Sequence, residues 1–79
     1  MSFQDVRPFT FGEFIKFRRE QLGISQSQIA RKLEVSERQY RNWESDKFKP
    51  NLDSLLPLLR ALNLRLQDIE SVLESESTS

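Results

Sequence analysis

The chain lacks both cysteine and histidine, and these two absences remove most of the chemistry that a small protein uses for catalysis or metal binding. Without cysteine there are no disulfides and no thiolate ligands for zinc. Without histidine, the usual general base at neutral pH and the commonest metal-binding side chain are missing as well. We therefore expect a protein that is not an enzyme and that has no metal or other cofactor.

Long apolar runs are also absent. No stretch approaches the roughly 20 apolar residues that cross a bilayer, and no secretory signal is visible, so we expect a cytoplasmic protein that does not bind membranes. The length of 79 residues is enough for one domain, and an apolar content of 37% is enough for a small helical core.

Neither sign of charge dominates, because 12 Lys and Arg balance 12 Asp and Glu. The distribution is uneven, however. Residues 1–50 hold ten basic and seven acidic side chains, whereas residues 51–79 hold two and five. Opposed halves of this kind can form a basic face for nucleic acid and an acidic back, although an ordinary mixed surface explains the same counts.

Helix-start signals divide the first half of the chain. Three segments have the form of the capping box S/T-x-x-E/Q: Thr10–Glu13, Ser25–Gln28 and Ser36–Gln39. Apolar residues at helical spacing follow each box and predict three helices, over residues 11–22, 26–33 and 37–44. Gly23 suits the left-handed position that ends the first helix.

The second half predicts two more helices. Asn51 can cap a helix whose core stripe comprises leucines 52, 55, 56, 59 and 62, and Pro57 should bend this helix or delay its start. Asn63 marks its end, and the last four apolar positions predict a short fifth helix: Leu66, Ile69, Val72 and Leu73. The domain is thus expected over residues 10–73, with an arm over residues 1–9 and a disordered polar tail over residues 74–79.

The segment from Ser25 to Trp43 has the pattern of a helix-turn-helix. On the helix over residues 37–44, Tyr40 and Trp43 share one side and are expected in the core. The opposite side carries the candidates for base contact: Glu37, Arg38, Arg41 and Asn42. Arginine can bond guanine, asparagine adenine and a carboxylate cytosine. The alternative is a solvated face with a Glu37–Arg41 ion pair.

In this order and spacing, residues 10–73 resemble the lambda-repressor-like domains of the Cro/XRE family. The resemblance rests on these motifs: Phe11-Gly12, Ile15-Lys16, Leu22-Gly23-Ile24-Ser25-Gln26, Ile29-Ala30, Val35-Ser36 and Tyr40 to Glu44. It implies an all-α, compact five-helix fold and a transcriptional regulator whose third helix reads double-stranded DNA, usually as a homodimer on a symmetric operator. Glu34 and Asp46 stand where the family usually has glycine, and a left-handed Glu34 would be strained by about 1 kcal/mol.

The resemblance also implies phosphate contacts outside the third helix. Gln26 is expected to contact a DNA phosphate and to support Glu37, and Ser25 has a similar expected contact, although capping explains it equally well. Lys47 and Lys49 resemble the family's phosphate-clamping loop, which contributes affinity but no sequence information.

Two further residues receive a structural role from the resemblance. Arg19 and Glu44 are expected to form an ion pair that ties the first helix to the third, and not to contact DNA directly.

A protein-binding adaptor or antitoxin on the same fold is the alternative function. The neutral net charge and the acidic second half favour it, as do the phenylalanines not assigned to the core: Phe3, Phe9, Phe17 and Phe48. The competing candidates for a dimer contact are Leu64, Leu66 and Val72.

Overall fold

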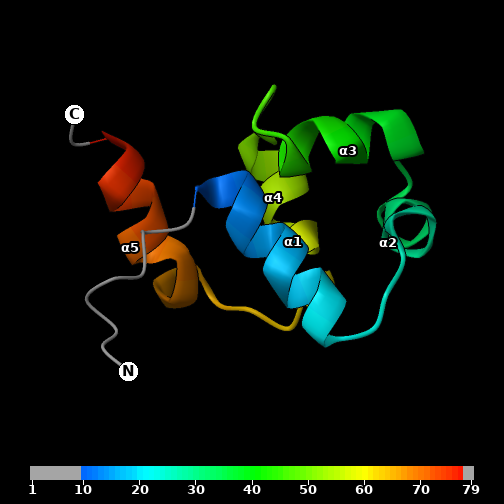
Figure 1. Cartoon of the computed structure of the whole chain (residues 1–79), viewed down its shortest axis with the longest axis horizontal. Coiled ribbons are helices and arrows are strands. Elements are labelled where there is room, and N and C mark those ends of the chain that lie inside the picture. Colours follow the sequence, from blue (N-terminus) through cyan, green and yellow to red (C-terminus); the bar gives the residue numbers. More distant parts are fainter. Residues whose placement is uncertain (1–9, 78–79) are drawn as a thin grey trace.

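Helices form where the sequence pairs an N-terminal cap with apolar residues at helical spacing. The computed structural model describes residues 10–77, which contain five helices: α1 (Phe11–Gln21), α2 (Gln26–Leu33), α3 (Glu37–Glu44), α4 (Leu52–Ala61) and α5 (Leu66–Ser77) (Figure 1). The predicted all-α, five-helix fold is confirmed over this range, and the predicted bounds of α2 and α3 coincide with those observed.

Side-chain caps begin the first four helices. Two predicted capping boxes close in both directions: Thr10–Glu13 and Ser25–Gln28. In the third, Ser36 Oγ accepts a hydrogen bond from the Gln39 amide at 3.0 Å, but the reciprocal bond from Ser36 N–H to the Gln39 side chain is not formed. Asn51 caps α4 through a 3.0 Å bond from the Ser54 amide to its Oδ1. The third capping box therefore forms only one of its two hydrogen bonds.

A residue with positive φ follows each of the first four helices: Gly23 (71°), Glu34 (60°), Asp46 (63°) and Asn63 (58°). Only the first is glycine. The carboxylate of Asp46 accepts hydrogen bonds from Thr10 Oγ1 at 2.6 Å and from Gly12 N at 2.8 Å. These bonds tie the turn after α3 to the N-terminus of α1.

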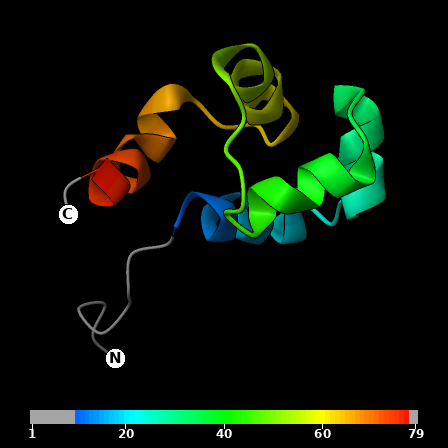
Figure 2. The same ribbon diagram turned by 90° about the horizontal axis from the view of Figure 1, so that it is seen from above.

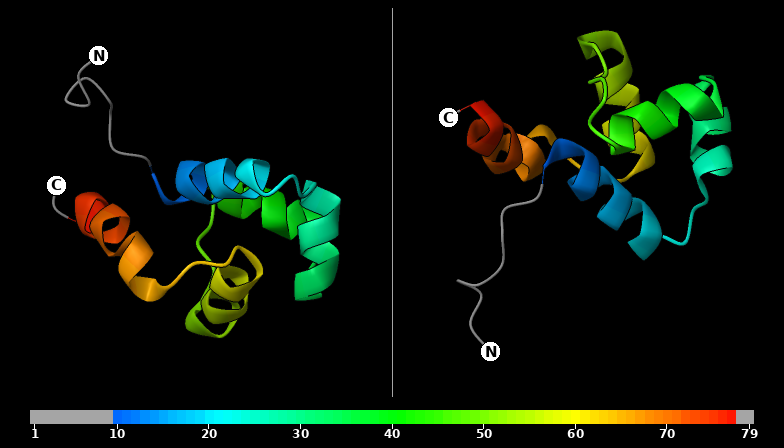
Figure 3. Two further views of the ribbon diagram at one scale, coloured as in Figure 1. Left: turned by 90° about the horizontal axis from the view of Figure 1, so that it is seen from below. Right: turned by 45° about the horizontal axis from the view of Figure 1, so that its top comes forward.

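The core lies where the inner faces of the helices meet. Helix α1 packs against α3 and α5, and α2 packs against α3 and α4. The buried apolar side chains are Phe11, Ile15, Ile29, Ala30, Tyr40, Trp43, Leu58, Leu59, Leu62, Ile69 and Val72. In Figure 2 the loop after α3 leads directly to α4. Both views in Figure 3 place α2 at one end of the molecule and α5 at the other.

The leucine stripe predicted for α4 is only partly buried: Leu59 and Leu62 lie in the core as predicted, but other members do not. Leu52 is 67% exposed and Leu56 is 40% exposed, whereas Leu58, which lay outside the predicted stripe, is fully buried. Leucines occupy so many positions of this helix that spacing alone does not select one face. Pro57 lies within α4, which begins at Leu52, so the proline does not delay the start of the helix.

The ends of α1 and α5 also differ from the prediction. Leu22 caps α1 and is 39% exposed, so it does not belong to the inner face. Helix α5 continues to Ser77, which corrects the expectation of a disordered tail for residues 74–77. Extending an existing helix is much easier than starting one, and no Gly or Pro interrupts this segment. The predicted arm, the side chain of Leu73 and residues 78–79 lie outside the described part of the chain.

No helix within residues 10–77 combines the length and the apolar character needed to cross a bilayer.

Candidate nucleic-acid interface

Two buried aromatic rings hold the inner side of α3. Tyr40 is 0% exposed and Trp43 is 2% exposed, and their ring centroids lie 6.0 Å apart in an edge-to-face arrangement at 72°. The opposite side of α3 carries the four residues predicted to contact bases, none of which is buried: Glu37, Arg38, Arg41 and Asn42. The orientation of this polar side is therefore set by the core.

The four polar side chains differ in whether they form an ion pair within the protein. Arg41 Nη2 lies 2.7 Å from Glu37 Oε2, and the two side chains are 57% and 41% exposed. A solvent-exposed i,i+4 pair contributes only about 0.3–0.5 kcal/mol, so opening it costs little. The ion pair predicted as the alternative is present, and it leaves base contact energetically accessible. Arg38 has no ion-pair partner within residues 10–77.

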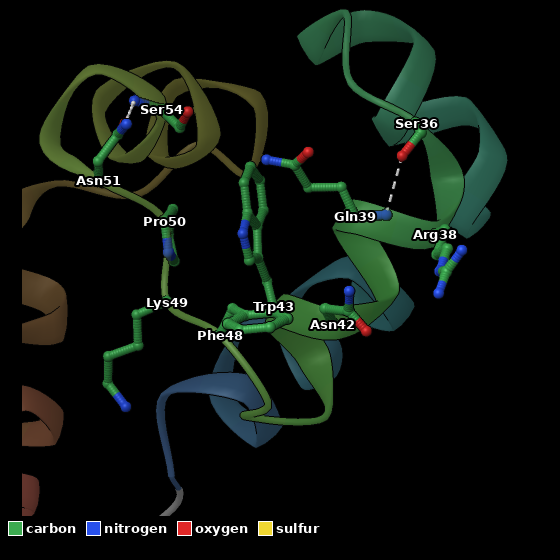
Figure 4. Close-up of a pocket in the computed structure, with 10 residues that line it drawn as sticks. All are labelled: Ser36, Arg38, Gln39, Asn42, Trp43, Phe48, Lys49, Pro50, Asn51 and Ser54. Atoms are coloured by element: carbon green, nitrogen blue, oxygen red, sulfur yellow. Dashed lines mark hydrogen bonds between the residues drawn. The ribbon is translucent and has the colours of Figure 1, made fainter.

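Arg38 and Asn42 border a pocket of about 370 Å³ between α3 and the loop that follows it (Figure 4). Its apolar lining includes Trp43 and Phe48, and Phe48 is 59% exposed. Lys49 also lines the pocket, but in Figure 4 its side chain points away from Arg38. Lys49 and Arg38 thus lie on different sides of this pocket.

A buried polar network joins α1, α2 and α3 at Glu44. Arg19 Nε lies 2.6 Å from Glu44 Oε2 and Arg19 Nη2 lies 3.3 Å from Oε1. The hydroxyl of Tyr40 donates to Oε2 at 2.6 Å, and Gln26 Nε2 donates to Oε1 at 2.9 Å. Arg19 Nη1 also donates to the carbonyl oxygen of Ile24 at 2.7 Å. Each carboxylate oxygen of Glu44 therefore accepts two hydrogen bonds.

The network shifts the pKa values of its members. Burial alone would raise the pKa of Glu44, but the hydrogen bonds from Arg19, Tyr40 and Gln26, together with the charge of Arg19, outweigh it and lower that pKa. The hydrogen bond to Glu44 raises the pKa of Arg19, and burial followed by the bond to Glu44 raises the pKa of Tyr40. Glu44 and Arg19 are thus both ionised, as an ion pair requires.

Gln26 does not support Glu37, which the resemblance implied in addition to a phosphate contact. It donates to Glu44, whereas Glu37 pairs with Arg41. Ser25 Oγ accepts from the Gln28 amide at 3.0 Å, so its capping role is realised.

Lys16 is a residue of this surface to which sequence reasoning assigned no DNA contact. It is exposed on α1 and lines a second pocket with residues from α2 and α3: Gln26, Arg41, Asn42, Glu44 and Ser45. One feature of the sequence could have pointed to Lys16. It lies three residues before Arg19, so the two side chains are neighbours on one face of α1. Within residues 10–77, no group of three His, Cys, Asp or Glu side chains forms a candidate metal site.

These features together define a helix-turn-helix of the DNA-binding class, with the inner side of α3 in the core and its outer side polar. Comparison with known families agrees with this class, because the family model described as Helix-turn-helix matches residues 15–69, more than half of the chain. The protein belongs to this family and is a DNA-binding regulator of the Cro/XRE type. No curated protein and no solved structure matches the chain significantly.

Proposed function

We propose that the protein is a sequence-specific regulator of transcription that inserts α3 into the major groove of double-stranded DNA. The observation that carries the proposal is the division of α3 into a buried aromatic side and an exposed polar side. A firmly held helix with an arginine-bearing outer side is suited to base readout. The proposed place of action is the cytoplasm, on the DNA of the nucleoid.

The outer side of α3 supplies the proposed base contacts. Arg38 and Arg41 each suit O6 and N7 of guanine, and Asn42 suits the corresponding edge of adenine. Glu37 suits the amino group of cytosine. Residues nearest the N-terminus of such a helix reach deepest into the groove, which favours Glu37 and the two arginines.

The surrounding turns supply the proposed backbone contacts. Gln26 and Ser25 lie at the start of α2, and Lys47 and Lys49 lie in the loop after α3. Contacts from these positions to phosphates would fix the register of α3 without reading sequence.

We further propose that two copies bind a two-fold symmetric operator. Half-sites one turn of B-DNA apart have centres about 34 Å from each other. The longest extent of the chain is 37 Å, so neighbouring copies are large enough to touch. Among the candidate contact residues, Leu66 is 49% exposed and available, whereas Val72 is only 8% exposed and belongs to the core. Leu64 is partly buried against the core.

A protein-binding module is the second candidate function. The observation that favours it is the exposure of Phe17, which is 46% exposed. Phe17 lines a pocket of about 380 Å³ with other residues of α1, with Leu64 from the turn before α5 and with Asp68 from α5. This surface lies apart from the outer side of α3, since the two share no lining residue.

A gel-shift assay at low and moderate salt, with random competitor DNA, separates the two candidates. The regulator should bind DNA tightly at low salt and retain a preferred site in the presence of competitor. Absence of any shift at low salt would exclude the regulator and leave the protein-binding module.

A further inference from the structure

The amide of Gln26 is held in a fixed direction by a buried carboxylate. Gln26 is the first residue of α2 and is half-buried, and its Nε2 lies 2.9 Å from Glu44 Oε1. The nitrogen must face the carboxylate, because two facing oxygens would repel. A glutamine Nε2 carries two N–H groups, so one remains after the bond to Glu44 is made. That second N–H has no acceptor within residues 10–77.

Glu44 is itself immobilised. Its other three hydrogen bonds come from two nitrogens of Arg19 and from the Tyr40 hydroxyl. The side chain of Glu44 is only 5% exposed and that of Arg19 only 9%. The carboxylate therefore acts as a rigid reference point for any group that bonds to it.

The pocket into which Gln26 opens carries positive charge. Lys16 from α1 and Arg41 from α3 line it; Arg41 is paired with Glu37, whereas Lys16 has no ion-pair partner in the described chain. Glu44 is the acidic residue of the lining, and its charge is balanced by Arg19. A singly charged oxyanion such as a phosphodiester group fits this arrangement of one unpaired cation, Lys16, and a free N–H donor.

We propose that Glu44 is a positioning residue for DNA binding, which aims the second N–H of Gln26 at one backbone phosphate that Lys16 also contacts. The inference rests on the proposed function, and it assigns this pocket to a single phosphate. A glutamine side chain that is already ordered loses little rotamer freedom when it binds. Glu44 therefore lowers the entropy cost of binding the phosphate.

The first test measures binding to duplexes that contain the preferred site and one neutral methylphosphonate at a time. In the unaltered protein, one backbone position beside α2 should weaken binding roughly three- to tenfold when neutralised. Gln26→Ala and Lys16→Ala should bind the normal site more weakly, and neutralising that position should have a smaller effect in each variant than in the unaltered protein. Lys16→Ala should also lower the slope of log affinity against log salt by about one.

Glu44→Gln tests whether Glu44 positions Gln26, because it leaves Gln26 and Lys16 themselves unchanged. The test requires that circular dichroism shows a folded variant. Neutralising the same backbone position should have a smaller effect in this variant, as in Gln26→Ala, while the base preference of α3 remains. If that position keeps its full effect, Glu44 does not position Gln26.

A measurement on the unaltered chain avoids the loss of charge that Glu44→Gln causes beside Arg19. Nitrogen relaxation of the side-chain amides should show Gln26 ordered in the free protein and Gln39 mobile, because the Gln39 side chain is exposed and has no hydrogen bond in the described residues. Equal mobility of the two amides would overturn the proposal. Site-specific binding without any phosphate coupled to Gln26 would refute this inference alone, whereas absence of site-specific binding would refute the proposed function with it.

Discussion

Glu34 and Asp46 share an unfavourable backbone conformation but differ in what compensates it. Their φ angles are 60° and 63°, in the left-handed region where side chains other than glycine are strained. The carboxylate of Asp46 accepts two hydrogen bonds from the start of α1. Glu34 is exposed and its side chain has no hydrogen bond or ion pair within residues 10–77. The strain at Glu34 is therefore not offset by side-chain bonds.

Glycine at these two positions should have opposite effects on stability. Glu34→Gly relieves the strain and should raise the free energy of unfolding by up to about 1 kcal/mol. Asp46→Gly relieves similar strain but removes two hydrogen bonds worth about 1 kcal/mol each, so it should lower that free energy by about 1 kcal/mol. Urea unfolding followed by circular dichroism measures both, and a change of the same sign in the two variants would contradict this account.

The two arginines on the outer side of α3 should each determine part of the sequence preference. Arg38→Ala and Arg41→Ala should each lose about 1–3 kcal/mol of binding to the preferred site and relax the preference at one base position. Arg41→Ala also leaves Glu37 without its partner, which adds repulsion from the phosphates. Arg31→Ala, which removes an exposed arginine from the last turn of α2 instead of from α3, is the matched control. Unchanged affinity of Arg41→Ala in a footprinting titration would refute base readout by Arg41.

At the scale of elements, α1 and α3 cross so closely that only glycine fits at the contact. A Cβ atom on Gly12 would lie 2.3 Å from the carbonyl oxygen of Glu44 and 2.7 Å from that of Trp43. Both obstacles are backbone atoms, which cannot rotate away as the end of a side chain can. Glycine in the Phe11-Gly12 motif therefore lets α1 lie directly against the backbone of α3 at Trp43 and Glu44.

Gly12→Ala should therefore push α3 away from α1. We expect a loss of about 1–3 kcal/mol in the free energy of unfolding, together with a change in the fluorescence of the buried Trp43. Gly23→Ala is the control, because nothing lies within 4 Å of its Cβ and its cost of about 1 kcal/mol comes only from a φ of 71°. Fluorescence that stays native in Gly12→Ala, with no loss of stability, would show that the crossing is not tight.

Acid should weaken the junction of the first three helices through Glu44. Its pKa is lower in the folded chain than the value of 4.5 that applies to an unperturbed carboxyl. As the pH falls, the unfolded chain takes up the proton first, so the stabilisation is complete above pH 4.5 and is lost as the pH falls through the lowered folded pKa. Urea unfolding between pH 7 and pH 3 should reveal this loss.

Two variants identify the carboxylate responsible for this acid sensitivity. Glu44→Gln should be less stable at pH 7 by about 3 kcal/mol or more, since it leaves the charge of Arg19 buried without a partner, and part of its acid dependence should disappear. Glu37→Gln, which changes an exposed carboxylate on the same helix, should keep the acid dependence of the unaltered chain. Identical acid profiles in Glu44→Gln and the unaltered chain would refute the assignment.

The elements themselves could be predicted because their signals are local. Ser25, Ser36 and the apolar residues after them define α2 and α3 within a few positions of the chain, and tertiary packing did not override these signals. The exposed Leu52 and buried Leu58 could not be predicted, because which side of a leucine-rich helix faces inward depends on its neighbours. The bond from Gln26 to Glu44 joins residues 18 positions apart, and it follows from how the helices pack, which the sequence pattern does not specify.

At the scale of the whole molecule, zero net charge is compatible with a face for DNA. Five exposed basic side chains lie on α1, on α3 and in the loop after α3: Lys16, Arg38, Arg41, Lys47 and Lys49. Four others in the described chain lie elsewhere, on α2, on α4 and just before α5: Arg31, Lys32, Arg60 and Arg65. The acidic residues Asp68 and Glu70 lie on α5, at the end of the molecule opposite to α2 (Figure 3). The basic side chains on and beside α3 should help to orient the protein as it approaches DNA, more strongly at low salt.

Selection of bound sites from a random pool of double-stranded DNA is the most direct test of the claim that α3 reads sequence. The account predicts enrichment of a two-fold symmetric site with half-site centres about 34 Å apart, and a relaxed preference at one position of each half-site with Arg38→Ala. A pool that stays random after repeated selection at low salt would contradict the account.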